Sequence, residues 1–495
     1  MPDTPSRPPR SGPRRRSATT PAQRTRRAEP TRFAAYTLLR AVADGAYANL
    51  EMPRILRQRR LEGRDAAFAT ELAFGTVRHQ GFYDAVVAVA ADRPTARIDD
   101  LVLDVLRLGC HQLLGMRVPA HAAADQTVGL ARSVAGQGAG GFVNAVLRRV
   151  GERTAQEWAD AVTPDGGGAA ALAVRYSHPE WVVTALRAAL LGHGRATPET
   201  VDAELAALLA SDNEPPQVHL VARPGLSTVQ ELVEGADAEP SPTSPLGVLL
   251  RSGDPGRLAA VRDGRAAVQD EGSQHVALAL AGAPVEPGTP GRWLDLCAGP
   301  GGKAGVLGAL ALEAGADLTA VEVSEHRADL VRSSLGTLVE RAAAAGRRVE
   351  VRTADGRELG AEEPGAYARV LVDAPCTGLG ALRRRPEARW RRQPADLATL
   401  GPLQRDLLRS ALDALAPGGV AAYATCSPHI AETRFVVTDV LKKRDDVELL
   451  DARPFVIDAP GVQLPDLGDG PTVQLWPHVH GTDAMFLALI RKRPA

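Results

Sequence analysis

The hydrophobic pattern of this 495-residue chain changes at about residue 265, and this change limits the possible folds more than any other feature. Beyond it, each short apolar run is followed by a loop or by apolar residues at helical spacing. The runs are Trp293–Cys297, Leu318–Val323, Val349–Arg352, Val370–Asp373 and Val420–Ala424. Strands that alternate with helices pair in parallel, so residues 265–495 are predicted to form a doubly wound, Rossmann-like α/β domain. Ala484–Ile490, after the turn at His480–Asp483, predicts an antiparallel closing strand.

Residues 32–155 follow a helical pattern instead. Apolar residues recur three or four positions apart within 34–42, 82–89, 98–105 and 142–150, which is the spacing of one helix face. We therefore expect an all-helical domain of six or seven helices. Residues 156–264 predict a linker and a small α/β region. Its expected helices are Trp181–Leu191 and Val201–Leu209, its expected strands are Val218–Ala222 and Leu246–Leu250, and residues 235–245 are expected to be a loop.

Residues 1–31 are predicted to be a disordered basic tail. The first thirty residues hold eight arginines and seven prolines and almost no large apolar side chain, so they cannot form a core. Such a tail can increase solubility or attract phosphate groups.

The rest of the composition excludes several classes of protein. The chain has no apolar run long enough to span a membrane and no secretory h-region. Its four cysteines form no CxxC pair, so neither a disulfide framework nor a metal site is expected. We expect a cytoplasmic protein, and a monomer, without a membrane partner.

A glycine-rich turn follows the first predicted strand of the α/β domain, in the segment Asp295–Lys303. It is neither a GxGxxG motif nor a P-loop, but its glycines let the backbone approach a ligand closely. Glu322 ends the second strand, where a carboxylate can bind the hydroxyls of a ribose, and Asp355 follows the third strand. Together these features predict a site for a nucleoside without a pyrophosphate, and S-adenosylmethionine fits that description. The candidate loop residues are Cys297, Ala298, Gly299, Pro300, Gly301, Gly302 and Lys303.

Two cysteines follow the last two parallel strands. Cys376 closes the segment Asp373-Ala-Pro-Cys, and Cys426 is the centre of Thr425-Cys-Ser427. A single cysteine at a strand end is commonly a buried small apolar residue. Two of them with Asp373 at the cofactor edge favour chemistry instead. A thiolate that adds to C6 of a cytosine makes C5 nucleophilic enough to accept a methyl group.

These segments resemble the NOL1/NOP2/Sun family of RNA cytosine-C5 methyltransferases. The matching stretches, in the family's order, are Val268–Gln274, Asp295–Lys303, Asp373–Cys376 with Arg384–Pro386, Thr425–Ser427 and His480–Asp483. The resemblance implies that Cys426 is the nucleophile, that Cys376 assists product release, and that Asp373 contacts base and cofactor. It further implies that Glu322 and Asp355 hold the adenosine portion and residues 297–303 the methionine portion. Two positions depart from the family pattern: Gly299, where Ala is frequent, and Glu432-Thr-Arg434, where the family has Glu-Asn-Glu.

The N-terminal helices, with Gly141–Arg148, resemble the NusB-like RNA-binding domain of the RsmB/Sun branch. That branch implies a cytosine of 16S rRNA as the target, position 967 in its naming. A plain helical protein-interaction module is the alternative for this domain. A tRNA target and a non-catalytic RNA assembly factor stay open for the whole chain. A DNA methyltransferase is disfavoured because those enzymes attack with the Pro-Cys cysteine alone.

A basic segment follows Cys376 directly. It contains six arginines and one acidic residue in ten positions: Arg383, Arg384, Arg385, Arg389, Arg391 and Arg392, with Glu387. Beside a catalytic loop, this charge favours contact with RNA phosphates over a merely solvated surface. Trp390 is expected either to stack on a base or to pack within the protein.

Overall fold

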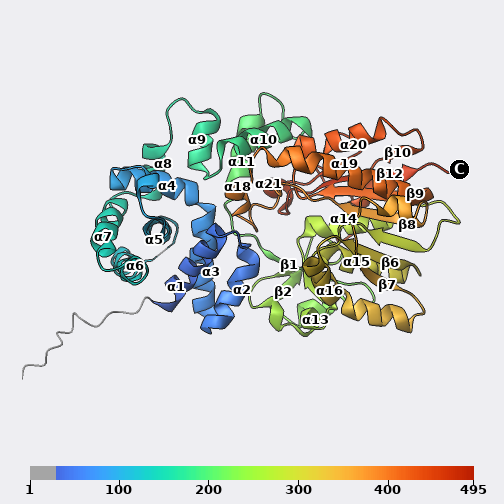
Figure 1. The fold of residues 1–495 in the computed structure, drawn as a ribbon, viewed down its shortest axis with the longest axis horizontal. Coiled ribbons are helices and arrows are strands. Elements are labelled where there is room, and N and C mark those ends of the chain that lie inside the picture. Colours follow the sequence, from blue (N-terminus) through green and yellow to red (C-terminus); the bar gives the residue numbers. More distant parts are fainter. Residues whose placement is uncertain (1–28, 117, 495) are drawn as a thin grey trace, which may run out of the picture.

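The computed structural model describes residues 29–116 and 118–494, so the predicted tail lies almost entirely outside the described residues (Figure 1). Residues 30–150 form seven α-helices around one apolar core, which confirms the all-helical prediction. They are α1 (Pro30–Ala43), α2 (Ala48–Arg59), α3 (Gly63–Arg78), α4 (Gln80–Ala91), α5 (Asp100–Cys110), α6 (Ala120–Ala135) and α7 (Ala139–Val150). In the described part of the chain, no helix has both the length and the apolar character of a membrane span.

Helix α5 shows how the sequence sets these elements. Asp99 begins it, because its carboxylate accepts the backbone N–H groups of Leu101 and Val102 at 2.9 and 3.3 Å. Such an N-cap satisfies donors that a helix start leaves unpaired. Its apolar stripe, which includes Val105 and Leu106, is fully buried in the core.

A small α/β region links this domain to the rest. It contains α8 (Ala155–Val162), α9 (Gly168–Arg175), α10 (Glu180–Gly192), α11 (Val201–Ser211), α12 (Val229–Glu234) and α13 (Ala259–Arg262). Its antiparallel sheet has the order β2-β3-β1-β4, formed by β2 (Ala238–Pro240), β3 (Gly247–Leu250), β1 (Val218–Ala222) and β4 (Ala266–Val268). Both predicted strands are present, but the expected loop 235–245 contains β2. This edge strand is short and polar, so hydrophobicity does not reveal it.

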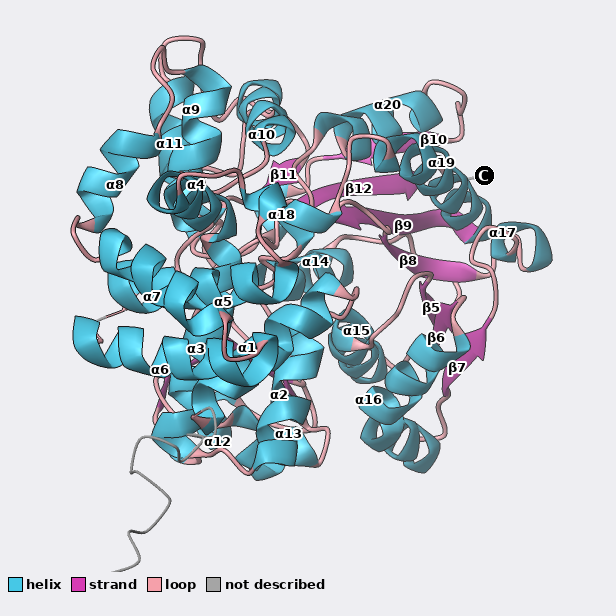
Figure 2. Ribbon diagram, turned by 60° about the vertical axis from the view of Figure 1, so that its left-hand side comes forward, coloured by secondary structure: helices cyan, strands magenta, loops and turns pink. Residues whose placement is uncertain are grey.

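The C-terminal domain is built on a mostly parallel sheet of order β10-β12-β9-β8-β5-β6-β7, with β11 paired to β12 (Figure 2). The parallel strands are β5 (Arg292–Asp295), β6 (Asp317–Glu322), β7 (Val349–Thr353), β8 (Tyr367–Asp373) and β9 (Leu415–Thr425). The antiparallel strands are β10 (Val447–Leu450), β11 (Val473–Gln474) and β12 (Phe486–Lys492). The predicted closing strand is therefore confirmed, and the Rossmann-like prediction is correct.

Helices cover both faces of this sheet, and each face has its own apolar core. One face carries α14 (Glu271–Gly282), α15 (Gly302–Glu313) and α16 (Glu325–Ala344); the other carries α17 (Leu359–Glu362), α19 (Asp396–Ala414) and α20 (Arg434–Leu441). The chain runs from β5 outward to β7 and then returns to β8 on the other side of β5. A ligand site is expected at this switch point, beyond the carboxyl ends of β5 and β8.

The basic segment after Cys376 connects the domains and corrects one expectation. Around α18 (Ala388–Arg391), Arg389 is fully buried and donates to the carbonyls of Arg78, Ser177 and Asp212 at 3.0–3.2 Å. Trp390 donates to the Val77 carbonyl and packs on the N-terminal domain, so it is not a base-stacking residue here. Arg389 is therefore a structural anchor between the domains, and the expectation that it contacts an RNA phosphate is wrong.

Arg389→Ala should destabilise the full chain strongly, because it leaves buried carbonyls and the nearby Asp212 without their cation. Loss of a buried charged donor costs about 3 kcal/mol or more, so we expect the melting temperature to fall by roughly 5 °C or more. Thermal denaturation of the full chain measures this. The control is Arg409→Ala, which removes a partly exposed arginine whose ion pair within the described residues is with Asp406. Equal melting temperatures for the two variants would contradict the anchor role.

Candidate active site

The two predicted cysteines lie together at the carboxyl edge of the sheet. Strands β8 and β9 are parallel neighbours in the register Asp373↔Ala424, so the loops that follow them start side by side. The Sγ atoms of Cys376 and Cys426 are 3.5 Å apart, and the backbone N–H of Gly380 donates to the Cys426 carbonyl at 2.9 Å. This places both sulfur atoms within reach of one small substrate group.

The surroundings distinguish the two thiols. The pKa of Cys426 is lowered by the hydrogen bond from Cys376, against the effect of burial, and the charges of Arg385 and Lys303 lower it further. The same hydrogen bond raises the pKa of Cys376 well above its usual range, and burial adds to this increase. The arrangement therefore favours a thiolate at Cys426 that accepts a hydrogen bond from a neutral thiol at Cys376.

A buried carboxylate that the sequence analysis did not assign to the site fixes both cysteine loops. Glu432 is 1% exposed. It accepts the backbone N–H of Thr377 at 2.8 Å and its hydroxyl at 2.5 Å, and the Ser427 hydroxyl at 2.7 Å. Gln404 donates both to Glu432 at 3.2 Å and to the Pro375 carbonyl at 2.8 Å. The sequence does show an acidic residue six positions after Cys426. Above, Glu432 is mentioned only because Glu432-Thr-Arg434 departs from the family's Glu-Asn-Glu.

Lys303 and Asp373 form a pair beside the cysteines. The ammonium group of Lys303 donates to Asp373 Oδ2 at 2.8 Å. Burial alone would lower the pKa of Lys303, but the charge of Asp373 and this hydrogen bond raise it. Lys303 is therefore a largely buried cation at the start of α15 that pairs with a carboxylate.

The glycine-rich loop turns tightly between β5 and α15. Gly301 has φ +106°, a conformation that L side chains rarely adopt, and a Cβ there would lie 2.8 Å from the Ser334 Cβ. The N–H of Gly299 donates to Glu322 Oε2 at 3.1 Å, and a Cβ at Gly299 would overlap that carboxylate. Glycine is therefore required at position 301 by its backbone conformation, whereas at position 299 a Cβ would have to displace the ends of the Glu322 and Arg327 side chains.

The other predicted cofactor residues line the same edge. Cys297 and Ala298 follow β5 directly, and the peptide between Gly299 and Pro300 is cis. Gly302 is the first residue of α15. Asp355 follows β7 and pairs with Arg357 at 2.5 Å, while Gly356 packs against the carbonyl of Leu296. In the described residues, Asp355 has no hydrogen bond to the loop, but the next residue, Gly356, lies against Leu296, which follows β5.

The loop has an acidic lining that suits a cationic ligand. Asp295, which was not among the predicted site residues, is fully buried; burial and the charge of Asp373 raise its pKa to about 7. One of its oxygens, Oδ2, has no hydrogen-bond partner. With Glu322 and Asp373 this gives three carboxyl groups beside two cations: Lys303 pairs with Asp373, and Arg327 lies 3.5 Å from Glu322 Oε2 and donates to the Gly299 carbonyl at 2.6 Å. Among the described residues, no group of three or more His, Cys, Asp or Glu side chains could hold a metal ion.

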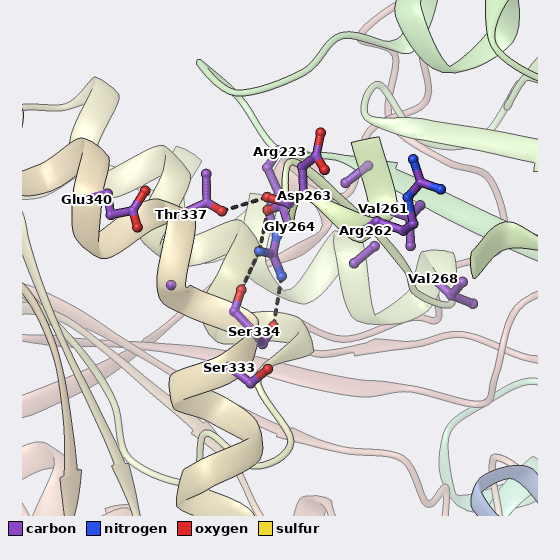
Figure 3. A pocket seen from close by; sticks show the side chains of 13 residues that line it. Arg223, Val261, Arg262, Asp263, Gly264, Val268, Ser333, Ser334, Thr337 and Glu340 are labelled. Carbon is purple, nitrogen blue, oxygen red and sulfur yellow. Dashed lines mark hydrogen bonds between the residues drawn. The ribbon is translucent and has the colours of Figure 1, made fainter. Parts of the chain in front are cut away.

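A buried arginine of the small α/β region, Arg223, is hydrogen-bonded to Ser334 of α16 (Figure 3). Arg223 is 1% exposed and donates to the Gly264 carbonyl and, on α16, to the carbonyl and hydroxyl of Ser334 at 2.6–2.9 Å. Ser334 in turn packs against Gly301. A cavity of about 530 Å³ lies next to Arg223, but none of the predicted catalytic or cofactor residues lines it. Arg223 therefore links the small region to the cofactor loop.

Gly305→Ala is expected to weaken binding of S-adenosylmethionine, because its Cβ would overlap the Arg223 guanidinium and push the support of the loop away. We expect the dissociation constant, measured by calorimetry, to increase about tenfold. Gly336→Ala on α16 is the matched control, since its Cβ has no neighbour within 4 Å. Equal affinity of the two variants would show that Arg223 does not support the loop.

Cys426 should be alkylated by iodoacetamide at a lower pH than an ordinary thiol, because a lowered pKa gives thiolate at lower pH. In Cys376→Ala the stabilising hydrogen bond is lost, so the midpoint of the rate profile should move to higher pH. Cys376→Ser keeps a donor and should shift it less. Cys297, whose pKa burial raises well above its usual value, serves as the internal control in mass spectra. An unchanged midpoint in Cys376→Ala would contradict the proposed hydrogen bond.

Comparison with known proteins agrees with this geometry. The family profile "16S rRNA methyltransferase RsmB/F" matches residues 283–491, and the profile of the NusB family matches residues 29–152. The chain is 52% identical to the Mycobacterium tuberculosis protein named as a methyltransferase, Rv1407, over 95% of this chain and 98% of that one. It is 33% identical to ribosomal RNA small subunit methyltransferase B of Pseudomonas putida, over 85% of this chain and 91% of that one.

The fold also has a solved counterpart. The crystal structure of PH0851 superimposes with a TM-score of 0.74 and covers 94% of this chain and 99% of that chain, at 20% sequence identity. At this identity the likeness shows a shared fold, including the N-terminal helices. From the profile matches and the identity to full-length relatives, the chain belongs to the RsmB/F family of 16S rRNA methyltransferases, with a NusB family domain at its N-terminal end.

Proposed function

We propose that this chain methylates C5 of a cytosine in 16S rRNA, with S-adenosylmethionine as the methyl donor and Cys426 as the nucleophile. One observation carries the proposal: two thiols 3.5 Å apart, with opposite pKa shifts, lie beside Lys303 and Asp373 at the switch point of the sheet. Methylation of an exocyclic nitrogen or a ribose hydroxyl needs no cysteine. A paired thiolate and thiol suit a reaction that forms and breaks a bond to carbon.

The residues of the glycine-rich loop fit the proposed donor. Residues 297–303 would hold its methionine portion, and Glu322 and Asp355 its ribose and adenine. The acidic lining of Asp295, Glu322 and Asp373 suits a ligand that carries an ammonium and a sulfonium charge. When bound, S-adenosylmethionine supplies an electrophilic methyl group at this edge of the sheet.

The protein's own groups account for the remaining chemistry. The Cys426 thiolate adds to C6 of the cytosine, which makes C5 nucleophilic. Asp373, held in place by Lys303, contacts the polar edge of the base. After transfer, a base takes the C5 proton, and the electrons of that C–H bond re-form the C5–C6 double bond as the Cys426–C6 bond breaks and the Cys426 thiolate is released. Cys376 lies one hydrogen bond from Cys426 and assists this release.

The proposed RNA substrate rests on the family and on the domain arrangement. The NusB family domain contacts the catalytic loop directly through Arg389 and Trp390, so a folded RNA bound to both domains can present one nucleotide to the thiols. A base in a hairpin must be exposed or flipped out to reach them. A tRNA target is the second candidate within the same chemistry. An assembly factor without catalysis is disfavoured, because it has no use for two convergent thiols.

The test combines S-adenosylmethionine and unmodified 16S rRNA with the wild-type chain, Cys376→Ala and Cys426→Ala. We expect wild type to form 5-methylcytosine. Cys376→Ala should accumulate a protein–RNA adduct that resists denaturant, because the covalent bond forms but is not released. Cys426→Ala should give neither product nor adduct, with activity reduced at least about a thousandfold.

Three outcomes would contradict parts of the proposal. Methylation of tRNA alone would remove the rRNA assignment and keep the chemistry. An adduct in Cys426→Ala but not in Cys376→Ala would reverse the two roles. RNA binding without methyl transfer by wild type would favour the assembly factor.

A further inference from the structure

Five of the six arginines that follow Cys376 are bound to other groups of the protein. Arg383 is buried and donates to the Gly481 carbonyl at 2.5 Å. Arg384 pairs with the fully buried Asp483. The other three donate to carbonyls or amides of neighbouring segments: Arg389 as described above, Arg391 to Ala46 at 2.6 Å, and Arg392 to Cys376 at 3.4 Å. Their guanidinium groups hold the catalytic loop against its surroundings.

Arg385 differs from these five. Among the described residues its side chain has neither a hydrogen bond nor an ion pair, and it is half-buried. The charge of Arg385 acts on the neighbouring acid, Glu387, but the two form no ion pair within 4 Å, and Glu387 accepts from the backbone N–H of Ala48 at 3.3 Å. A cation without an ion-pair partner in a partly desolvated position is unfavourable unless a ligand supplies the anionic partner.

The backbone that carries Arg385 is fixed on both sides. Its N–H donates to the Ala381 carbonyl at 2.9 Å, Arg384 before it is tied to Asp483, and Glu387 after it is tied to the N-terminal domain. The backbone position of Arg385 is therefore set by the protein. Gly380, next to Ala381 in the same loop, donates to the Cys426 carbonyl at 2.9 Å, so Arg385 is carried by the loop that contacts the nucleophile, and its charge acts on Cys426.

We propose that Arg385 binds a backbone phosphate of the RNA next to the target cytosine. A guanidinium presents a planar fork that matches two phosphate oxygens, and it stays charged at every relevant pH. A nucleotide whose base reaches Cys426 brings its own phosphates to the mouth of the site. Arg385 is thus assigned to substrate binding, whereas its five neighbours keep the loop in place. This inference rests on the proposed function for the identity of the RNA.

The experiment measures binding of the full chain to an unmodified 16S rRNA transcript at several salt concentrations, without a methyl donor. Each phosphate contact contributes about 0.7–0.9 to the slope of log K against log salt. Arg385→Ala should reduce the slope by about that amount and weaken binding at low salt about tenfold. Arg385→Lys should retain the slope, because it keeps the charge, and recover part of the affinity.

The matched control is Arg347→Ala. Arg347 is exposed, has no side-chain partner in the described residues, and precedes β7 at the opposite edge of the sheet. The Arg347→Ala variant should have the wild-type salt slope and affinity for the transcript. A wild-type slope and affinity in Arg385→Ala would overturn the inference. A lower melting temperature of Arg385→Ala with an unchanged slope would overturn it as well and make Arg385 a structural residue.

Binding and turnover separate this inference from the function on which it rests. If wild type transfers no methyl group but Arg385→Ala still loses one phosphate contact, the proposed reaction fails and the binding role stands. If wild type methylates the transcript and Arg385→Ala keeps the full slope, the reaction stands and the binding role fails.

Discussion

The site depends on one buried carboxylate. Glu432 accepts hydrogen bonds from the loop that carries Cys376, through Thr377, and from the loop that carries Cys426, through Ser427. A buried charge without partners would be very costly, so the loops must stay where their donors satisfy it. The separation of 3.5 Å between the two sulfur atoms follows from this constraint together with the parallel pairing of β8 and β9. The relative position of the two thiols is therefore fixed by a residue outside the pair.

A second constraint joins the domains. The chain after Cys376 packs against the N-terminal domain. There Arg389 donates to a carbonyl of that domain, at Arg78, and to carbonyls of the small α/β region, at Ser177 and Asp212. Arg223 makes a similar link from the small α/β region to the back of the cofactor loop. In both cases a planar cation satisfies several carbonyls at once, which a lysine cannot reproduce. The carboxyl edge of the sheet is thus in contact with both the N-terminal domain and the small α/β region. A movement of either region would displace the loops at this edge.

The sequence predicted the fold well because hydrophobic spacing reports burial. The strand Val218–Ala222 has the predicted bounds, and the five parallel strands include the five predicted runs to within a few residues. Strand β2 was missed because an edge strand of three residues carries little apolar signal. The convergence of Cys376 and Cys426 could be predicted because the carboxyl ends of neighbouring parallel strands share one edge.

The sequence was less informative about charged residues. A count of arginines cannot show which ones have partners inside the protein, so Arg389 was wrongly expected at the RNA. Glu432 and Asp295 were overlooked for the same reason. The role of a buried carboxylate depends on its hydrogen-bond and charge partners, and these lie far away in the sequence. Asp355 follows β7, and its role in binding the adenosine portion stays a prediction.

The most direct measurement of the central claim is bisulfite sequencing of 16S rRNA from cells of the source organism. Wild-type cells, cells without this gene, and cells complemented with Cys426→Ala would be compared. We predict one cytosine that resists conversion in wild type and is converted in both other strains. A pattern of resistant cytosines that is the same in all three strains would contradict methylation of 16S rRNA at C5 by this protein.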